Sequence, residues 1–136
     1  AKAKALGLFA VPGFFTPTEA FALLAAGADA LKLFPAEGAS PQVLSAMRAV
    51  FQPETAVLAA GGVSAANLAA WRKAGAAGYG IGSSIYKPGD DAATVRVKAK
   101  ALVAALKASE QGALIDGGYV EPVPHRSGRI LNDMWE

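Results

Sequence analysis

The chain has 136 residues, 53% of them hydrophobic and 18% charged, and 13 Lys plus Arg against 11 Asp plus Glu leave a formal charge of +2 at pH 7. These values fit one compact soluble domain, and the absence of any run of like charges argues against a nucleic-acid or anionic-membrane surface. The chain has no Cys and one His, His125. It therefore cannot carry a disulfide framework, a thiol nucleophile or a His-based metal cluster of its own.

Targeting signals are not evident in the sequence. No apolar stretch reaches the roughly 18 residues that a membrane helix needs, and the first residues lack the apolar core and cleavage region of a secretory signal. The chain does not begin with Met, and its pattern starts as though inside a domain. We therefore expect a cytoplasmic protein that belongs to a longer or split fold.

Short apolar runs alternate with Gly or Pro turns and with helical patterns, which is typical of βα units. The first strand is expected at residues 8–11. The run Thr16-Pro17-Thr18-Glu19 then predicts a capping box with Pro at the first helical position, and Gly27 is placed to end that helix. The second strand is expected at residues 30–34, where Pro35 closes it.

Two further units follow in the same order. Ser40-Pro41 begins a helix, residues 56–60 form a third strand, and Ser64 is placed to cap a helix that Gly75 ends. The fourth strand is expected at residues 78–81, and the last helix at about Asp91 to Lys107.

Four such units predict an α/β fold with two alternatives, either half of a (β/α)8 barrel or a small open parallel sheet. A complete barrel takes about 200 residues or more, so this chain is too short for eight units. We divide it into a partial barrel at residues 1–108 and an extended tail of unknown role at residues 109–136, where Gly and Pro replace helical periodicity.

Lys32 is the most informative residue, because it lies within an apolar strand. Alternation turns Leu31 and Leu33 toward the helices and Lys32 toward the barrel interior or a cleft. Desolvation there would favour the neutral amine, a nucleophile that condenses with a ketone to a Schiff base whose iminium accepts electrons during C–C cleavage. The alternative is a structural lysine that snorkels from the strand end or pairs with a carboxylate.

Two turns follow the third and fourth strands, Gly61-Gly62-Val63-Ser64 and Gly82-Ser83-Ser84. Bare backbone amides and hydroxyls at adjacent strand ends suit a phosphate group, which barrels often bind after their last two strands. Taken alone, the Gly-Gly pair is as well explained by a tight turn. The two turns together favour the phosphate site.

Other polar and aromatic residues near the strand ends have simpler explanations. Pro12 and Phe34 could line an apolar pocket beside Lys32, or could be ordinary turn and core residues. Glu19 is explained by helix capping and Glu37 by an exposed loop, so neither is assigned the catalytic proton. We expect His125 to be a surface residue.

The combination of these motifs resembles the 2-dehydro-3-deoxy-6-phosphogluconate and -6-phosphogalactonate aldolases. The matching runs, in order, are Val11-Pro12-Gly13, Thr16-Pro17-Thr18-Glu19, Leu31-Lys32-Leu33-Phe34-Pro35-Ala36-Glu37, Gly61-Gly62-Val63-Ser64 and Gly82-Ser83. The resemblance extends from about Ala1 to Ala108 and corresponds to the second half of that family's (β/α)8 TIM barrel. The run from Ser84 to Gly89 looks more like the phosphogalactonate branch.

The resemblance implies a class I aldolase that needs no metal or other cofactor. Such an enzyme splits a phosphorylated 2-keto-3-deoxy sugar acid into pyruvate and glyceraldehyde 3-phosphate. Lys32 matches the Schiff-base lysine and Phe34 the aromatic residue beside the pyruvyl group. Thr16 and Pro17 match a turn near the site whose direct role is left open, and we expect Pro12 and Thr16 to be substrate-binding residues. The phosphate-binding positions match Gly61, Gly62, Ser83 and Ser84.

The same resemblance implies that acid/base groups lie elsewhere. The family's general-base glutamate and its carboxylate-binding arginine belong to the first half of the barrel, which this sequence does not match. We therefore expect little activity from the chain alone, and we expect a homo-oligomer or association with an N-terminal half. The alternative is a non-catalytic half-barrel that binds a phosphorylated metabolite or pairs with another chain.

Overall fold

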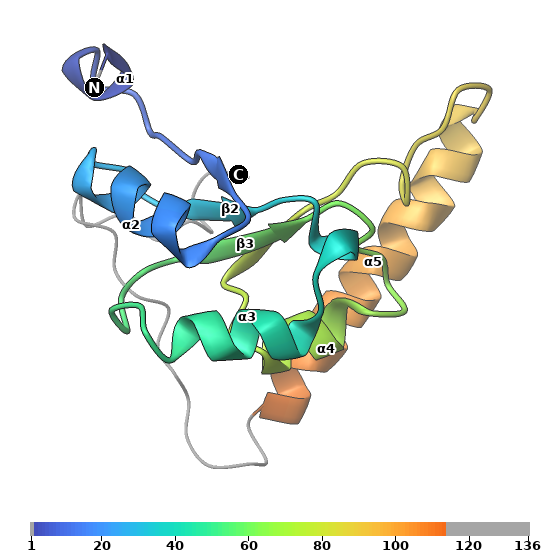
Figure 1. Ribbon diagram of the computed structural model, residues 1–136. Helices are drawn as coiled ribbons and strands as arrows, with labels where there is room; N and C mark the ends of the chain where they lie inside the picture. Colours follow the sequence, from blue (N-terminus) through green and yellow to red (C-terminus); the bar gives the residue numbers. More distant parts are fainter. Residues whose placement is uncertain (1, 114–136) are drawn as a thin grey trace.

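The computed structural model describes residues 2–113, and these form one parallel sheet with helices between its strands (Figure 1). The elements are α1 (Lys2–Ala5), β1 (Gly13–Phe14), α2 (Pro17–Ala25), β2 (Leu31–Leu33), the 3-10 helix η1 (Ala36–Gly38), α3 (Pro41–Arg48), β3 (Val57–Ala60), α4 (Leu68–Lys73), β4 (Gly78–Gly80) and α5 (Ala92–Ala113). None of the described helices combines the length and hydropathy needed to cross a membrane.

The strands lie side by side in the order β1-β2-β3-β4, and all neighbours are parallel. A barrel keeps consecutive strands adjacent in this way, whereas a doubly wound sheet reverses its order at a switch point. The predicted α/β class is confirmed, and the strand order is that of part of a (β/α)8 barrel.

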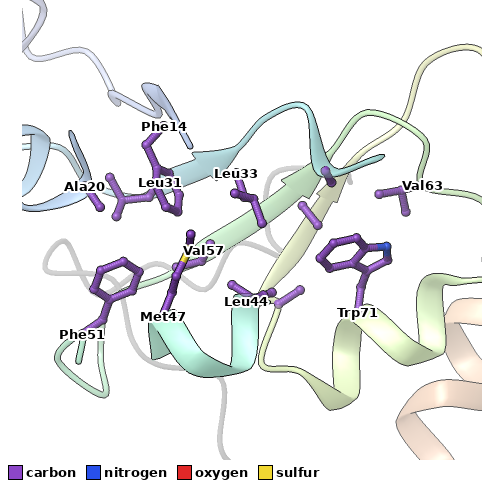
Figure 2. Close-up of a cluster of buried hydrophobic side chains, with 13 residues drawn as sticks. Phe14, Ala20, Leu31, Leu33, Leu44, Met47, Phe51, Val57, Val63 and Trp71 are labelled. Carbon is purple, nitrogen blue, oxygen red and sulfur yellow. The ribbon is translucent and has the colours of Figure 1, made fainter. Parts of the chain in front are cut away.

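One face of the sheet is packed against helices α2, α3 and α4. Leu31, Leu33 and Val57 point to this face and are fully buried. Figure 2 shows these side chains between the sheet and α3, in one cluster with Leu44 and Met47 of that helix. Because side chains alternate along a strand, the residues between these positions face the other side of the sheet.

Helices α2 and α3 begin where the sequence predicts. The Thr16 hydroxyl accepts a hydrogen bond from the Glu19 N–H, and the Ser40 hydroxyl accepts one from the Val43 N–H, each at 3.3 Å. At the far ends of α2 and α4, Gly27 and Gly75 have φ of +88° and +95°. These are the left-handed conformations that glycine adopts without steric cost.

The first strand differs from its expected position at residues 8–11. The Ala10 carbonyl accepts a hydrogen bond from the N–H of Asp29, just before β2. The Ala10 N–H, however, donates to the Asp29 carboxylate and not to a neighbouring strand. Pro12 then accepts from the Lys32 N–H but has no N–H to donate. Regular pairing is therefore confined to Gly13 and Phe14.

Two helix boundaries also differ from expectation. Ser64 does not cap α4, which begins at Leu68 after a turn, with Asn67 at its N-cap position. Helix α5 continues to Ala113, past the expected end near Lys107 and past the boundary drawn at residue 108. Its first turns extend beyond the sheet (Figure 1). The rest of the expected tail, with His125, lies outside the described residues.

Candidate active site

The loops that follow β1, β2 and β3 lie against one another, because parallel strands end at the same edge of a sheet. Phe15, after β1, packs on Gly38, where a Cβ would lie 3.5 Å from the Phe15 Cζ. After β2, the Glu37 N–H donates to the Gly61 carbonyl at 3.1 Å. A Cβ at Gly61 would lie only 3.2 Å from the Cα of Pro35, so the absence of a side chain lets these two loops touch.

Lys32 occupies the middle of β2 on the sheet face opposite the helix-packed core. Its neighbours Leu31 and Leu33 are fully buried, whereas Lys32 is partly buried. Gly13 and Leu58 stand beside it in the sheet register. A Cβ at Gly13 would lie 3.5 Å from the Lys32 Cε, an ordinary van der Waals distance, so the lysine side chain runs alongside this glycine. The alternation that the sequence predicts for this strand is therefore present.

The Lys32 amine lies beside an aromatic ring. Its Nζ is 5.4 Å from the centroid of the Phe34 ring, within the range of a cation–π contact. Among the described residues no carboxylate forms a salt bridge with it, so the alternative of a structural ion pair finds no partner there. Phe34 is 53% exposed. This open face leaves Lys32 less desolvated than the closed interior that the sequence analysis assumes.

Pro12 and Thr16, predicted at the substrate-binding edge, are both engaged in hydrogen bonds within the chain. The Pro12 carbonyl accepts from the Lys32 N–H at 2.9 Å. The Thr16 hydroxyl donates to the Glu19 carboxylate at 3.0 Å and accepts from the Glu19 N–H, so the helix cap uses it in both directions. Backbone hydrogen bonds from Phe15 and Thr16 lower the pKa of the Glu19 carboxyl below its usual range. The capping explanation for Glu19 is confirmed.

The Gly61–Gly62 turn offers backbone N–H groups as hydrogen-bond donors. Gly61 and Gly62 have φ of +91° and +72°, which a residue with a Cβ adopts only at a steric cost. Within the described part of the chain, the N–H groups of Gly62 and Val63 donate to no protein acceptor. Two adjacent donors of this kind can bind the oxygens of an anion.

A hydrogen bond connects this turn to the turn that follows β4. The Ser84 hydroxyl donates to the Val63 carbonyl at 2.8 Å, so its proton is already engaged. Ser83 is exposed, and the N–H groups of Ser83 and Ser84 have no acceptor among residues 2–113. The structure thus brings together the two turns that the sequence pattern pairs. The two serines differ, because within residues 2–113 the Ser84 hydroxyl is hydrogen-bonded and the Ser83 hydroxyl is not.

Glu37 makes a contact that its place in an exposed loop did not indicate. Its side chain covers the Gly62 position so closely that a Cβ there would lie 2.8 Å from the Glu37 Cβ and 3.0 Å from Oε2. A carboxylate therefore lies beside the predicted phosphate turn. Nothing in the local sequence marks this contact, because the two residues come from different loops.

Asn67 is a second residue that the sequence analysis missed. Its side-chain Oδ1 accepts from the Ser64 N–H and its Nδ2 donates to the Gly62 carbonyl, both at 2.9 Å. Asn is among the residues preferred just before a helix, which is the one signal that could have identified it. In the described part of the chain, no cluster of three His, Cys, Asp or Glu residues is placed to hold a metal ion.

A family model described as KDPG and KHG aldolase matches residues 2–100. The chain is 47% identical over 102 residues to "Probable 2-dehydro-3-deoxy-6-phosphogalactonate aldolase" of Rhizobium meliloti (strain 1021), an alignment that covers 75% of this chain and 48% of the relative. It is 43% identical over 110 residues to "2-dehydro-3-deoxy-6-phosphogalactonate aldolase" of Escherichia coli (strain K12), with 81% and 54% covered.

A solved structure described as "Native KDPGal structure" has the same fold as this chain. The two superimpose with a TM-score of 0.78 at 43% sequence identity, over 80% of this chain and 53% of the other. The chain thus spans about half the length of the curated relatives it matches.

Proposed function

The chain belongs to the KDPG and KHG aldolase family, and from this membership we propose that it supplies the Schiff-base half of a class I aldolase. The substrate is 2-dehydro-3-deoxy-6-phosphogalactonate, the compound in the names of both curated relatives, or its gluconate epimer. The products are pyruvate and glyceraldehyde 3-phosphate. The observation that carries the proposal is Lys32 on the open sheet face beside Phe34, without a salt bridge to any described carboxylate.

In the proposed reaction the Lys32 amine attacks the C2 ketone of the sugar acid, and loss of water gives a protonated imine. A base removes the proton of the C4 hydroxyl, the C3–C4 bond breaks, and its electron pair moves to the iminium nitrogen to form an enamine. The aldehyde leaves as glyceraldehyde 3-phosphate. Protonation of the enamine at C3 and hydrolysis of the imine release pyruvate and free Lys32.

The phosphate end of the substrate is proposed to lie at the two linked turns. The N–H groups of Gly62 and Val63 on one turn and of Ser83 and Ser84 on the other are the donors. The Ser83 hydroxyl is exposed and adds a further donor, while Ser84 acts mainly by joining the turns. Gly61 allows the first turn to lie against the loop after β2.

Proton transfer is proposed to come from outside the described residues. The Glu19 carboxylate accepts three hydrogen bonds at the start of α2, which leaves it a poor base. Glu37 lies against the Gly62 turn, at the phosphate end of the proposed site. The chain spans about half of its relatives, so we propose that a complementary half-barrel supplies the base.

Borohydride reduction in the presence of pyruvate tests the role of Lys32 directly. The natural chain is expected to gain one reduced pyruvyl group, located on Lys32 by peptide mass spectrometry. Lys32→Arg should abolish this product, because a guanidinium does not form an imine under these conditions. Lys73→Arg, which changes an exposed lysine of α4, should not. Equal labelling of Lys32→Arg, or labelling spread over surface lysines, would refute the assignment.

A non-catalytic half-barrel is the second candidate, supported by the exposed Phe34 and the partly buried Leu58 on the open sheet face. In that case the chain binds a phosphorylated metabolite, or covers this face with a second copy or another chain, and does no chemistry. The pyruvate experiment separates the two candidates. A chain that binds phosphate but forms no imine would favour the module.

A further inference from the structure

Asn67 connects two points of the loop that leads from β3 to α4. Its Nδ2 donates to the Gly62 carbonyl and its Oδ1 accepts from the Ser64 N–H, each at 2.9 Å. Only one orientation of the amide satisfies both partners, since a carbonyl accepts and an N–H donates. One partly buried side chain thus fixes both ends of the segment Gly62–Ser64.

The turn needs such a restraint because it begins with two adjacent glycines, Gly61 and Gly62. Gly61 and Gly62 both have positive φ, and glycine has more conformations to lose than any other residue. An unrestrained turn would have to become ordered when a ligand binds, which lowers affinity. The bonds from Asn67 use the Gly62 carbonyl and the Ser64 N–H. They leave free the Val63 N–H, which lies between these two groups, and the Gly62 N–H, which comes just before them.

We propose that Asn67 is the positioning residue of the phosphate-binding turn. It touches no substrate; it holds the Gly62 and Val63 amides in the orientation that binds a phosphoryl oxygen. The inference rests on the proposed function, because that function assigns the phosphate to this turn. Through the Ser84 bond to the Val63 carbonyl, the same restraint also sets where the second turn lies relative to the first.

Two variants test the proposal with inorganic phosphate as the probe in isothermal titration. Asn67→Ala removes both hydrogen bonds. Asn67→Asp keeps the size of the side chain and an acceptor for the Ser64 N–H, but it has no N–H for the Gly62 carbonyl. Because it also adds a negative charge, its phosphate affinity is compared at high salt, where charge repulsion is screened. Each is expected to weaken phosphate binding by about tenfold, the effect of losing one or two hydrogen bonds that hold the binding groups in place.

The matched control is Gln42→Ala. It removes an exposed side-chain amide of α3 that makes no hydrogen bond within residues 2–113, so phosphate affinity should stay within twofold of the natural chain. Pyruvate trapping on Lys32 should be equal in all the proteins, since Lys32 lies on another strand. A general loss of structure would lower both readouts, whereas a positioning role lowers only phosphate binding.

Amide hydrogen exchange gives a readout that does not depend on any ligand. The Ser64 amide should be protected in the natural chain and should exchange faster in Asn67→Ala. If the Ser64 amide exchanges freely in the natural chain, or if both Asn67 variants bind phosphate as the natural chain does, the role of Asn67 is refuted. If the natural chain itself showed no pyruvate trapping, the proposed function would be refuted, while the hydrogen-exchange result for Asn67 would remain valid.

Discussion

At the scale of single residues, the proposed site depends on which hydroxyl groups are already hydrogen-bonded within the chain. Ser83 and Ser84 are adjacent and chemically identical, yet the hydroxyl of Ser84 is committed to the Val63 carbonyl and that of Ser83 is not. Thr16 likewise has its hydroxyl occupied by Glu19. Residue type alone does not distinguish a ligand from a structural support.

Glu37 leads to a prediction at this scale. Its carboxylate lies against Gly62 and should repel a bound phosphate, so Glu37→Gln is expected to tighten inorganic phosphate binding about threefold to tenfold, as expected for a partly screened pair of like charges. Titration at low and high salt measures the effect, which should shrink as salt rises. Glu54→Gln, at an exposed loop position, serves as the control and should change nothing. Weaker binding by Glu37→Gln would mean that the carboxylate supports the turn.

At the scale of elements, α2 and β2 show how short segments are specified. The capping box of α2 involves residues three apart, and every hydrogen bond in it lies within one turn of chain. The burial pattern of β2 follows from strict alternation between Leu31, Lys32 and Leu33. In contrast, α4 begins three residues later than it would if Ser64 were its N-cap. The Asn67 side chain, at the N-cap position, bonds back to the loop.

The capping box predicts a pH dependence of stability. Hydrogen bonds from the Phe15 and Thr16 N–H groups lower the pKa of Glu19 in the folded chain, so the stabilisation is present at pH above the ordinary glutamate pKa and is lost as pH falls through the folded pKa. Glu19→Gln should therefore lower the melting temperature at pH 7 by a few degrees. The difference between variant and natural chain should shrink as the pH falls below the ordinary glutamate pKa, and it should close once the pH is below the lowered pKa of Glu19 in the folded chain.

Thermal melts by circular dichroism between pH 3 and 8 would measure this difference. Glu54→Gln, in an exposed loop, provides the comparison for loss of one negative charge and should show no such pH-dependent gap. A difference for Glu19→Gln that persists unchanged at acid pH would show that the ionised carboxylate does not stabilise the cap.

At the scale of the whole molecule, the helices within residues 2–113 pack on one face of the sheet only. Leu31, Leu33 and Val57 are buried beneath helices, while Lys32 and Phe34 lie on the face that remains open. In the barrel of the family, that face is the interior. A second half-barrel, from another copy or from a separate segment, would cover it and exclude water from Lys32.

We therefore expect the chain alone to form the pyruvate imine but to cleave substrate very slowly. We assign the general base to none of the described residues, and such a base contributes roughly 100-fold to 10,000-fold in rate. Adding the part of the Escherichia coli relative that this chain does not match, produced separately, should raise turnover in a coupled assay for glyceraldehyde 3-phosphate. Light scattering should show the two pieces associating.

The control for complementation is the same mixture with the Lys32→Arg chain, which should stay inactive. Rapid turnover by the purified chain without any partner would contradict the expectation. It would require Glu37, or a carboxylate from a second copy, to perform the proton transfer.

Features that depend on neighbours along the chain could be predicted from the sequence alone. The caps at Thr16 and Ser40, the glycine ends of α2 and α4 and the phase of Lys32 in β2 were all predicted correctly. Each depends on residues within about four positions of one another, where backbone geometry and side-chain periodicity leave few choices. The motifs at Lys32 and at the two turns were sufficient to identify the family.

The contacts between the separate loops became evident only in the tertiary structure. The contact of Glu37 with Gly62 joins the loops after β2 and β3, and the Ser84 bond to Val63 joins the loops after β3 and β4. The delayed start of the strand at Gly13 depends on Asp29, which lies on another segment. No local pattern encodes these contacts, because parallel strands bring their ends together only after the sheet has formed and the intervening helices have packed on it.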